Sequence, residues 1–227
     1  MSNPSRAFYD PLSRDYESFI RQLVPRYEEL SETVLSLVSD EEPMSVLEIG
    51  TGTGAAAVSL LRSLPSTRLT AVEDSSEMKD RAEQALAEYA DRARVVHSDI
   101  RAYALDGIVD AVFASLVLHN VRPGERQVLV ERIASWLRPG GLFVWAEFLR
   151  FEDPVVQAAV EVARQEFARA SGCPEDVVAW NFKKEAEDDF PPTVEEVLDA
   201  AKSAGFASAD LVWAHDAFGV FSLRTSR

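Results

Sequence analysis

Three glycines on alternate positions are the first residues in this sequence whose types and spacing point to chemistry. Gly50, Gly52 and Gly54 lie in the stretch VLEIGTGTGAAAVSLL, residues 46–61, which begins as a β-like run and ends as a helix-like one. Alternating glycines let the backbone turn sharply and let a ligand approach the amides at a helix N-terminus. The stretch therefore predicts a strand–loop–helix unit that binds a cofactor.

Two different cofactor loops fit these glycines. Gly50-x-Gly52-x-x-Ala55 matches the dinucleotide fingerprint, and Glu48-x-Gly50-x-Gly52-x-Gly54 matches the loop that binds S-adenosylmethionine. Glu48 favours the second, because a carboxylate there would face the like charge of a pyrophosphate but could hold an ammonium group. A helical stretch before the loop, which could roof a site, and an antiparallel hairpin at the end of the chain also depart from a plain dinucleotide fold.

A candidate general base follows further along the chain. His119, in LVLHNV, comes just after a predicted strand, where the carboxyl edge of a parallel sheet forms a site. The alternative is a histidine that caps the loop or packs under a lid. Glu147, in WAEF, also points to this edge and could orient substrate or pair with Arg150. His97 and His215 lie among apolar neighbours on strands and are interpreted as structural.

Composition limits the classes of partner. The net charge of −15 argues against a nucleic-acid partner, because phosphate binding relies on clustered Lys and Arg. No run of 18 apolar residues and no apolar h-region are present, so neither a membrane span nor a secretory signal is expected. The single cysteine, Cys173, fits a reducing cytoplasm. We expect a cytoplasmic protein with a small-molecule substrate, no membrane partner and no metal.

The elements that must position these residues alternate between strand and helix, which predicts an α/β fold with a parallel sheet and helices on both faces. Strands are expected at 44–50, 68–74, 93–99, in 109–121 and after a turn in 137–148. Helices are expected in 8–38 with a break near Pro25, and at 55–64, 75–89, 125–137 and 193–204. The last two strands, 208–216 and 217–225, are too close for a helical crossover and must form an antiparallel edge hairpin.

We interpret the chain as one domain of four parts. These are an N-terminal helical cap (1–42), a cofactor-binding core (43–150), a helical lid insertion (151–192), and a last helix with its hairpin (193–227). The first lid helix is expected to pack through the apolar face Val156, Ala159, Val160, Ala163 and Phe167. Specificity is expected to come from the two covers, whose aromatic residues are Phe8, Tyr9, Tyr16, Phe19, Tyr27, Trp180 and Phe182, with Asn181 beside them.

Five segments in order, VLEIGTGTGAAA, TAVEDSSEM, VVHSDIRAY, DAVFASLVLHNV and WLRPGGLFVWAE, make the chain resemble the class I S-adenosylmethionine-dependent methyltransferases. The resemblance implies a Rossmann-like fold with a mainly parallel seven-stranded sheet and an antiparallel last strand. It implies S-adenosylmethionine as cofactor, S-adenosylhomocysteine as product, and a ribose-binding acid at Glu73 with Asp74 as the alternative. The implied cofactor-binding residues are Glu48, Gly50, Thr51, Gly52, Gly54, Glu73, Asp74, Met78, Asp99, Ile100, Ser115 and Leu116.

Within this family the chain resembles the carboxy-S-adenosylmethionine synthase branch, through IRQLVPRYEEL, RPGERQVLVERI, FEDPVVQ and AGFASADL…FGVFSL. The resemblance places Tyr27 near the transferred group and implies a homodimer. That branch uses an arginine before the last helix to bind a carboxylate, but Val178–Phe190 offers only Lys183 and Lys184, which lack the planar two-donor fork.

Ordinary methyl transfer to a small molecule is therefore the leading hypothesis. Its candidate catalytic residues are His119, Tyr27 and Glu147, and its candidate substrate-binding residues are Tyr16, Tyr27, Trp180 and Phe182. A carboxy-S-adenosylmethionine synthase-like enzyme is the alternative, and a catalytically silent binding homologue is a third hypothesis.

Overall fold

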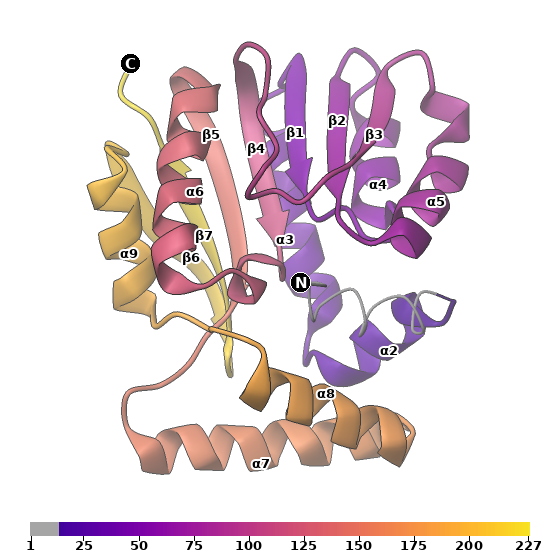
Figure 1. Cartoon of the computed structure of the whole chain (residues 1–227), viewed down its shortest axis with the longest axis vertical. Helices are drawn as coiled ribbons and strands as arrows, with labels where there is room; N and C mark the ends of the chain where they lie inside the picture. Colours follow the sequence, from indigo (N-terminus) through magenta and orange to yellow (C-terminus); the bar gives the residue numbers. More distant parts are fainter. Residues whose placement is uncertain (1–13) are drawn as a thin grey trace.

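A computed structural model describes residues 14–227, so Phe8 and Tyr9 lie outside the described residues. Its centre is a seven-stranded sheet with the strand order β3-β2-β1-β4-β5-β7-β6 (Figure 1). The strands are β1 (Ser45–Ile49), β2 (Arg68–Glu73), β3 (Ala93–His97), β4 (Val109–Ser115), β5 (Leu137–Phe148), β6 (Ser208–His215) and β7 (Phe218–Arg224). β1 to β5 pair in parallel, and β7 lies antiparallel between β5 and β6. The predicted fold class and the closing hairpin are confirmed.

Helices cover both faces of this sheet. α3 (Tyr27–Ser39) and α4 (Ala55–Ser63) pack their apolar residues on one face, and α5 (Ser76–Ala85) packs beside α4. α6 (Pro123–Trp136) and α9 (Val194–Ser203) cover the other face. The strands are apolar on both sides, which is what a sheet buried between two helical layers requires. The described part of the chain contains no helix that is both long and apolar enough to cross a membrane.

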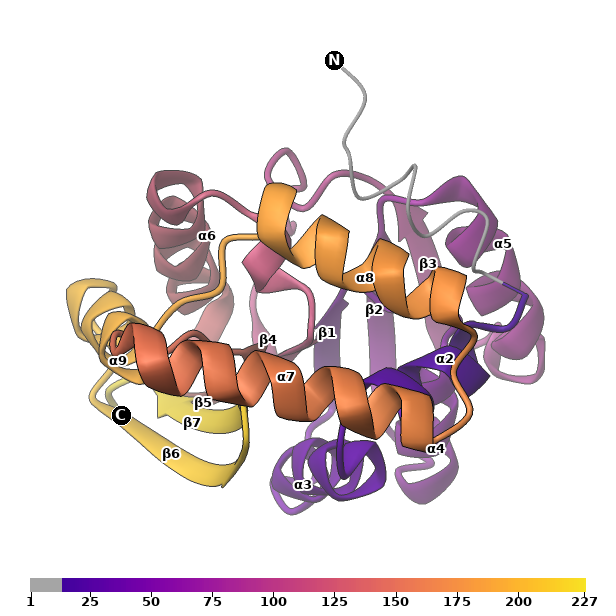
Figure 2. The ribbon, with the colours of Figure 1, turned by 90° about the horizontal axis from the view of Figure 1, so that it is seen from below.

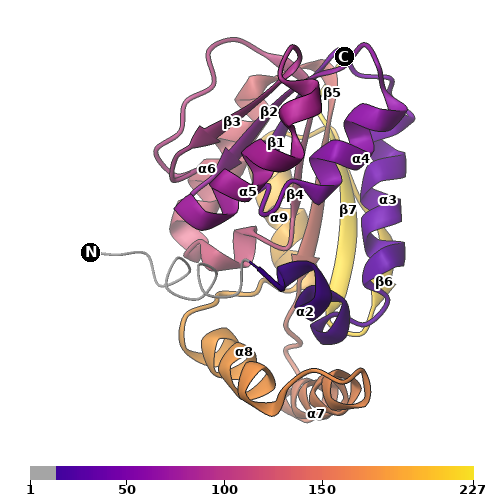
Figure 3. The same ribbon diagram turned by 90° about the vertical axis from the view of Figure 1, so that its right-hand side faces the viewer.

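Three more helices gather at one end of the sheet. α2 (Tyr16–Leu23) packs against α7 (Pro154–Ala170), and α8 (Glu175–Glu187) lies alongside α7. Figures 2 and 3 show α7 and α8 crossing this end, with α2 between them and the sheet. The predicted helical cap therefore divides: α2 lies over this end, whereas α3 packs on the face of the sheet.

Several local predictions needed correction. α5 ends at Ala85, and a separate 3-10 turn, η1, follows at Ala87–Tyr89. The expected turn after α6 is instead the start of β5, whose pairing with β4 shifts register between Val109 and Ala111. α7 packs only partly through the predicted face: Val160 and Phe167 are half-buried, whereas Val156, Ala159 and Ala163 are exposed. Its fully buried residues are Arg164 and Ala168. The buried positions keep a helical period, but one of them is an arginine, and a pattern of apolar residues does not identify it.

Candidate active site

The glycine loop joins β1 to α4 and has the backbone that its sequence predicts. Gly52 and Gly54 have φ of +58° and +86°, in the left-handed region that favours glycine. A Cβ on Gly54 would lie 3.1 Å from the Cα of Ala82, so this glycine lets α4 and α5 approach closely. A Cβ on Gly52 would meet only the Cε1 atom of Tyr16, at 4.0 Å. The backbone at Gly52 is therefore open to a ligand.

Glu48 is buried at the end of β1, with 3% of its surface exposed. Thr51 Oγ1 donates a hydrogen bond to Glu48 Oε2 at 2.6 Å. Burial raises the pKa of Glu48 to about 7, with the Thr51 hydrogen bond opposing the shift and the charge of Glu73 adding to it. No lysine or arginine among the described residues binds this carboxylate. A buried acid without a cation is a suitable partner for a ligand ammonium group.

Glu73 ends β2 and faces the same loop. Its Oε2 atom accepts a hydrogen bond from the Gly52 amide at 2.8 Å, and its Oε1 atom accepts from the amides of Asp74 and Ser75 at 3.0 and 2.9 Å. Burial raises its pKa, and these amide hydrogen bonds oppose the shift. The three amides fix the carboxylate beside the loop and leave it further lone pairs, which can accept the hydroxyl protons of a diol.

The cavity around this loop fits S-adenosylmethionine by the chemistry of its donors and acceptors. Glu48 can bind the ammonium group of the cofactor, and Glu73 can accept hydrogen bonds from its ribose hydroxyls. The open backbone at Gly52 leaves room for the part of the cofactor that links these two groups. Two adjoining pockets make up this cavity, and the predicted residues that line one or both are Tyr16, Tyr27, Glu48, Gly50, Thr51, Gly52, Glu73, Met78, Ser115 and Leu116. Tyr27 thus lies on the cofactor side with Glu48, and burial raises its pKa to about 12.

Other predicted cofactor residues lie elsewhere or make different contacts. Gly54 serves helix packing, as described above. The Asp99 carboxylate binds the side chain of Arg101, whose Nε atom lies 3.0 Å from both carboxylate oxygens. Neither Asp99, Ile100 nor Asp74 is among the residues lining these pockets. The cofactor-binding role of Asp99 and Ile100 stays a prediction.

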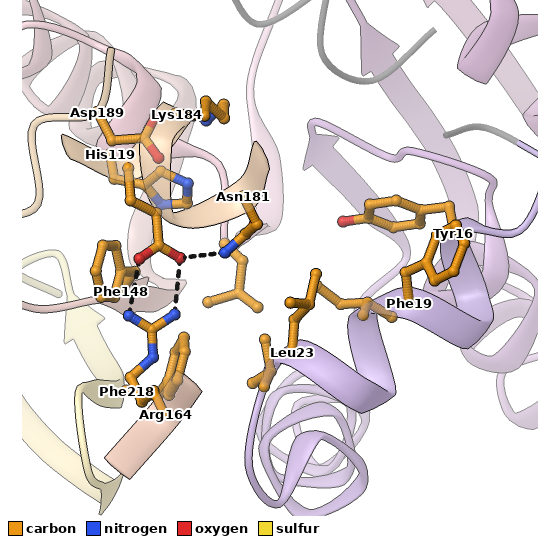
Figure 4. A pocket seen from close by; sticks show the side chains of 14 residues that line it. Tyr16, Phe19, Leu23, His119, Phe148, Arg164, Asn181, Lys184, Asp189 and Phe218 are labelled. Atoms are coloured by element: carbon orange, nitrogen blue, oxygen red, sulfur yellow. Dashed lines mark hydrogen bonds and ion pairs between the residues drawn. The ribbon is translucent and has the colours of Figure 1, made fainter. Parts of the chain in front are cut away.

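A second pocket adjoins the cofactor cavity, and we call it the acceptor pocket. Its volume is about 590 Å³ including its open mouth, and Tyr16 and Leu116 line both cavities. One wall is apolar and comes mainly from α2, with Tyr16, Phe19, Ile20, Leu23 and Val24. The opposite wall is polar and carries His119, Arg164, Asn181, Lys184, Glu185 and Asp189 (Figure 4).

His119 stands at this polar wall in a 3-10 turn, η2 (Leu118–Asn120). Its Nδ1 atom lies 2.7 Å from Oε1 of Glu147, which is fully buried at the end of β5. Glu147 also accepts hydrogen bonds from the Phe148 amide and from Nε1 of Trp145, both at 2.8 Å. Because the carboxylate acts as an acceptor, His119 Nδ1 must donate, and Nε2 is the nitrogen left to accept a proton. Arg150 pairs with Glu196 instead, so the predicted alternative of a Glu147–Arg150 pair is wrong.

The lid supplies residues that the sequence did not predict for the site. Arg164 on α7 makes a two-pronged ion pair with Glu185 on α8, with nitrogen–oxygen distances of 2.9 and 2.7 Å. Lys184 binds Asp189 and donates to Asn120 Oδ1 at 2.7 Å. For the Arg164–Glu185 pair, the only signal in the sequence was the arginine itself, which lies at a buried position of α7. Trp180 is 37% exposed, and neither Trp180 nor Phe182 is among the residues lining the three pockets.

The lid and the turn that carries His119 are also joined through the backbone. The Phe190 amide donates to the carbonyl of His119 at 2.7 Å, and the buried Arg126 side chain donates to the Phe190 carbonyl. Arg126 also reaches the carbonyls of Leu118 and Val121, both at 3.5 Å. The position of His119 is therefore tied to the end of the lid.

The sheet is covered by helices on both faces and has β7 reversed. Together with the acid-flanked glycine loop and the second acid at the end of β2, this fold defines an S-adenosylmethionine-dependent methyltransferase. Residues 46–141 match a family model described as a methyltransferase domain. A carboxy-S-adenosyl-L-methionine synthase of Shewanella woodyi is 30% identical over 171 residues, 73% of this chain and 70% of that protein. One of Shewanella amazonensis is 28% identical over 202 residues, 86% and 83% of the two chains. The chain belongs to the class I S-adenosylmethionine-dependent methyltransferases.

Solved structures agree with this fold. The N-methyltransferase NodS from Bradyrhizobium japonicum, in complex with S-adenosyl-L-homocysteine, has a TM-score of 0.62 at 16% identity, covering 93% of this chain and 98% of that one. The S-adenosylmethionine-dependent methyltransferase SibL has a TM-score of 0.64 at 20% identity and covers 87% of this chain. The chain spans 55% of the length of SibL. S-adenosylmethionine is the cofactor of the family.

Proposed function

We propose that this protein transfers a methyl group from S-adenosylmethionine to a hydroxyl oxygen of a small molecule. The observation that carries the proposal is the buried His119–Glu147 pair, 2.7 Å apart, in a pocket that shares Tyr16 and Leu116 with the cofactor cavity. A histidine whose Nε2 atom is left to accept a proton suits an acceptor whose proton must be removed, and a hydroxyl group is such an acceptor.

The residues divide the work as follows. Glu48, Gly52 and Glu73 would hold the cofactor, which supplies an electrophilic methyl group on a sulfonium when bound. Leu116 and Tyr16 line the junction of the two cavities and keep water away from the line of transfer. His119 Nε2 takes the hydroxyl proton, and Glu147 keeps the ring in the required tautomer and stabilises the imidazolium that forms.

An assay for S-adenosylhomocysteine release, run on a panel of hydroxylated, amino and thiol compounds, tests this function. We expect turnover with hydroxyl compounds, and the methylated product should carry the new group on oxygen. Turnover confined to amines or thiols, or an activity that survives His119→Ala unchanged, would contradict the proposal.

A carboxy-S-adenosylmethionine synthase-like activity is the second candidate, and similarity to proteins of that name favours it. Arg164 does place an arginine in the acceptor pocket, but Glu185 already binds its Nη1 and Nη2 atoms and balances its charge. Mass spectrometry of the nucleotide that copurifies with the protein separates the two activities, because the product of the synthase is heavier by one carboxyl group. The homodimer implied by the sequence resemblance is a further proposal, which light scattering tests.

A further inference from the structure

The lysine, the arginine and the two acids that line the acceptor pocket are all engaged with partners of opposite charge. Arg164 binds Glu185 and Lys184 binds Asp189, and the His119 ring is hydrogen-bonded to Glu147. The first two pairs are well buried: the side chains of Arg164, Lys184 and Asp189 are 4%, 5% and 2% exposed, and that of Glu185 is 15% exposed. Figure 4 shows Arg164, Lys184 and Asp189 with His119 on one side of the cavity.

The Arg164–Glu185 pair is also held from outside its own ion pair. Asn181 Nδ2 donates to Glu185 Oε1 at 2.8 Å. The guanidinium carbon of Arg164 lies 4.5, 5.1 and 4.9 Å from the ring centres of Phe148, Phe182 and Phe218, which makes cation–π contacts with three rings. A guanidinium held by three rings and a two-pronged carboxylate has no freedom to turn toward a second anion.

We propose that the acceptor pocket selects an uncharged, largely apolar hydroxyl compound and that the Arg164–Glu185 pair excludes acceptors that carry a carboxylate. An entering carboxylate would either displace Glu185, which would leave that acid buried without a cation, or lie beside Glu185 as a second anion on one guanidinium. An entering ammonium group would have to separate one of the two acids from its cation in the same way. The hydroxyl part of this proposal rests on the proposed function, whereas the exclusion of charge rests on the ion pairs alone.

One donor on Arg164 is compatible with a neutral ligand. Its Nε atom is buried and has no hydrogen-bond partner among residues 14–227. Glu185 occupies the Nη1–Nη2 edge of the guanidinium and balances its charge, so a second carboxylate at the Nε side would meet the like charge of Glu185. A neutral carbonyl or ether oxygen brings no such charge, so an acceptor with a neutral oxygen apart from its reactive hydroxyl is compatible with this wall.

Matched probe pairs test the proposal by binding rather than by turnover. We would titrate the full chain, loaded with S-adenosylhomocysteine, with 4-hydroxybenzamide and 4-hydroxybenzoate, and with 6-hydroxy-2-naphthamide and 6-hydroxy-2-naphthoate. Within each pair the shape is nearly the same and only the charge differs. At least one amide should bind at least about tenfold more tightly than its carboxylate, since about 1.4 kcal/mol corresponds to a tenfold difference. Equal or tighter binding of the carboxylates, or no binding of either amide, would overturn the proposal.

Variants of Glu185 test whether the Arg164–Glu185 pair causes the preference for amides over carboxylates. Glu185→Gln frees the Arg164 charge, so carboxylate binding should strengthen about tenfold while amide binding changes less than about threefold. Glu185→Asp keeps the charge and should keep the preference for amides. Glu187→Gln makes the same charge change at an exposed position of the same helix and serves as the control. Unchanged carboxylate binding in folded Glu185→Gln would overturn the role of the pair, and the wild-type ratio stands by itself if that variant does not fold.

This test separates the two proposals. Turnover by S-adenosylhomocysteine release measures the proposed function, and the amide-to-carboxylate binding ratio measures the selection against charge. A protein that binds amides but methylates nitrogen would contradict only the function, and one that methylates charged hydroxyl compounds would contradict only the selection.

Discussion

Glu48 and Glu73 in the cofactor cavity have no lysine or arginine partner among the described residues, whereas Glu185 and Asp189 in the acceptor pocket each bind one. The two cavities adjoin, with Tyr16 and Leu116 lining both, but they differ in whether their acids have a cationic partner. The unpaired Glu48 of the first cavity suits a cationic group of the ligand, and the paired charges of the second cavity suit a neutral ligand. A charged side chain that has no partner within a site therefore indicates the charge of the ligand group that binds there.

The largest expected effect is on the acceptor side. His119→Ala should lower kcat by a factor of about 10² to 10⁴, because it removes the base that takes the hydroxyl proton. The Kd for S-adenosylhomocysteine should change less than about threefold, since His119 lines only the acceptor pocket of the cavities described. Steady-state kinetics and calorimetry measure the two quantities. His215→Ala, on the edge strand β6, is the control. Loss of cofactor binding in His119→Ala would show that the two cavities are not independent.

The next effect is on the cofactor side. Glu73→Ala should weaken S-adenosylhomocysteine binding about 30- to 100-fold, which corresponds to about 2–2.7 kcal/mol and lies within the range of about 1.5–3 kcal/mol for one hydrogen bond to a charged group. Part of this loss comes from the Gly52, Asp74 and Ser75 amides, which lose their acceptor. Glu77→Ala, exposed on α5, is the matched control. Calorimetric affinity within twofold of the wild type would remove Glu73 from the ribose site.

The pH dependence of cofactor binding tests the unpaired charge of Glu48. Its pKa of about 7 leaves the acid mostly neutral at pH 6 and mostly ionised at pH 7.5. The ammonium group prefers the ionised form, so affinity for S-adenosylhomocysteine should rise about eightfold over this interval, following the ionised fraction. Calorimetry at several pH values measures it. The rise should disappear in Glu48→Gln, and a flat wild-type profile would mean that Glu48 does not meet the ammonium group.

Glu48 should also make the stability of the cofactor-free protein depend on pH. This stability should fall as the pH rises, whereas the affinity for the cofactor rises. The folded pKa of Glu48 lies above its ordinary value of 4.5, so its contribution to stability is complete below pH 4.5. That contribution is lost as the pH rises through about 7. Thermal unfolding of wild type and Glu48→Gln between pH 5 and pH 8 should therefore show a fall that the variant lacks. Saturating S-adenosylhomocysteine should reduce the fall.

The smallest effect is expected at the lid surface. Trp180→Ala should change the acceptor KM less than about twofold and stability by less than about 0.5 kcal/mol, because the side chain is exposed and lies outside the acceptor pocket. Kinetics and thermal unfolding measure this variant. A large rise in KM would extend the acceptor site beyond the pocket described here and would weaken the contrast between the two cavities.

The cofactor cavity was largely predictable from the sequence because it is local. Glu48 and the glycines lie on one strand and its following loop, and Glu73 ends the next strand, so the βαβ period brings them together. The fold followed from the same alternation, since apolar runs and turn residues mark each element. Thr193 and Glu196 form the capping box that begins α9, which places a helix start within one residue of the prediction.

The acceptor pocket was less predictable because its partners are distant in sequence. Glu185 lies 21 residues from Arg164, and Glu147 lies 28 residues from His119. The Arg164–Glu185 pair forms only once α7 and α8 have packed, and no local pattern specifies that packing. Trp180 shows the same limit, because α8 turns Val177, Val178 and Phe182 inward and leaves the neighbouring Trp180 exposed.

The polar wall of the acceptor pocket has a consequence for the evolution and engineering of the enzyme. Arg164, Asn181, Lys184, Glu185 and Asp189 all belong to one uninterrupted stretch of chain, residues 151–192, whereas Glu48, Gly52 and Glu73 lie outside it. Exchange of this stretch between homologues would replace five residues of the wall in a single recombination event and leave the methyl donor's binding residues unaltered. A library of such chimaeras would diversify the choice of acceptor on a constant catalytic scaffold.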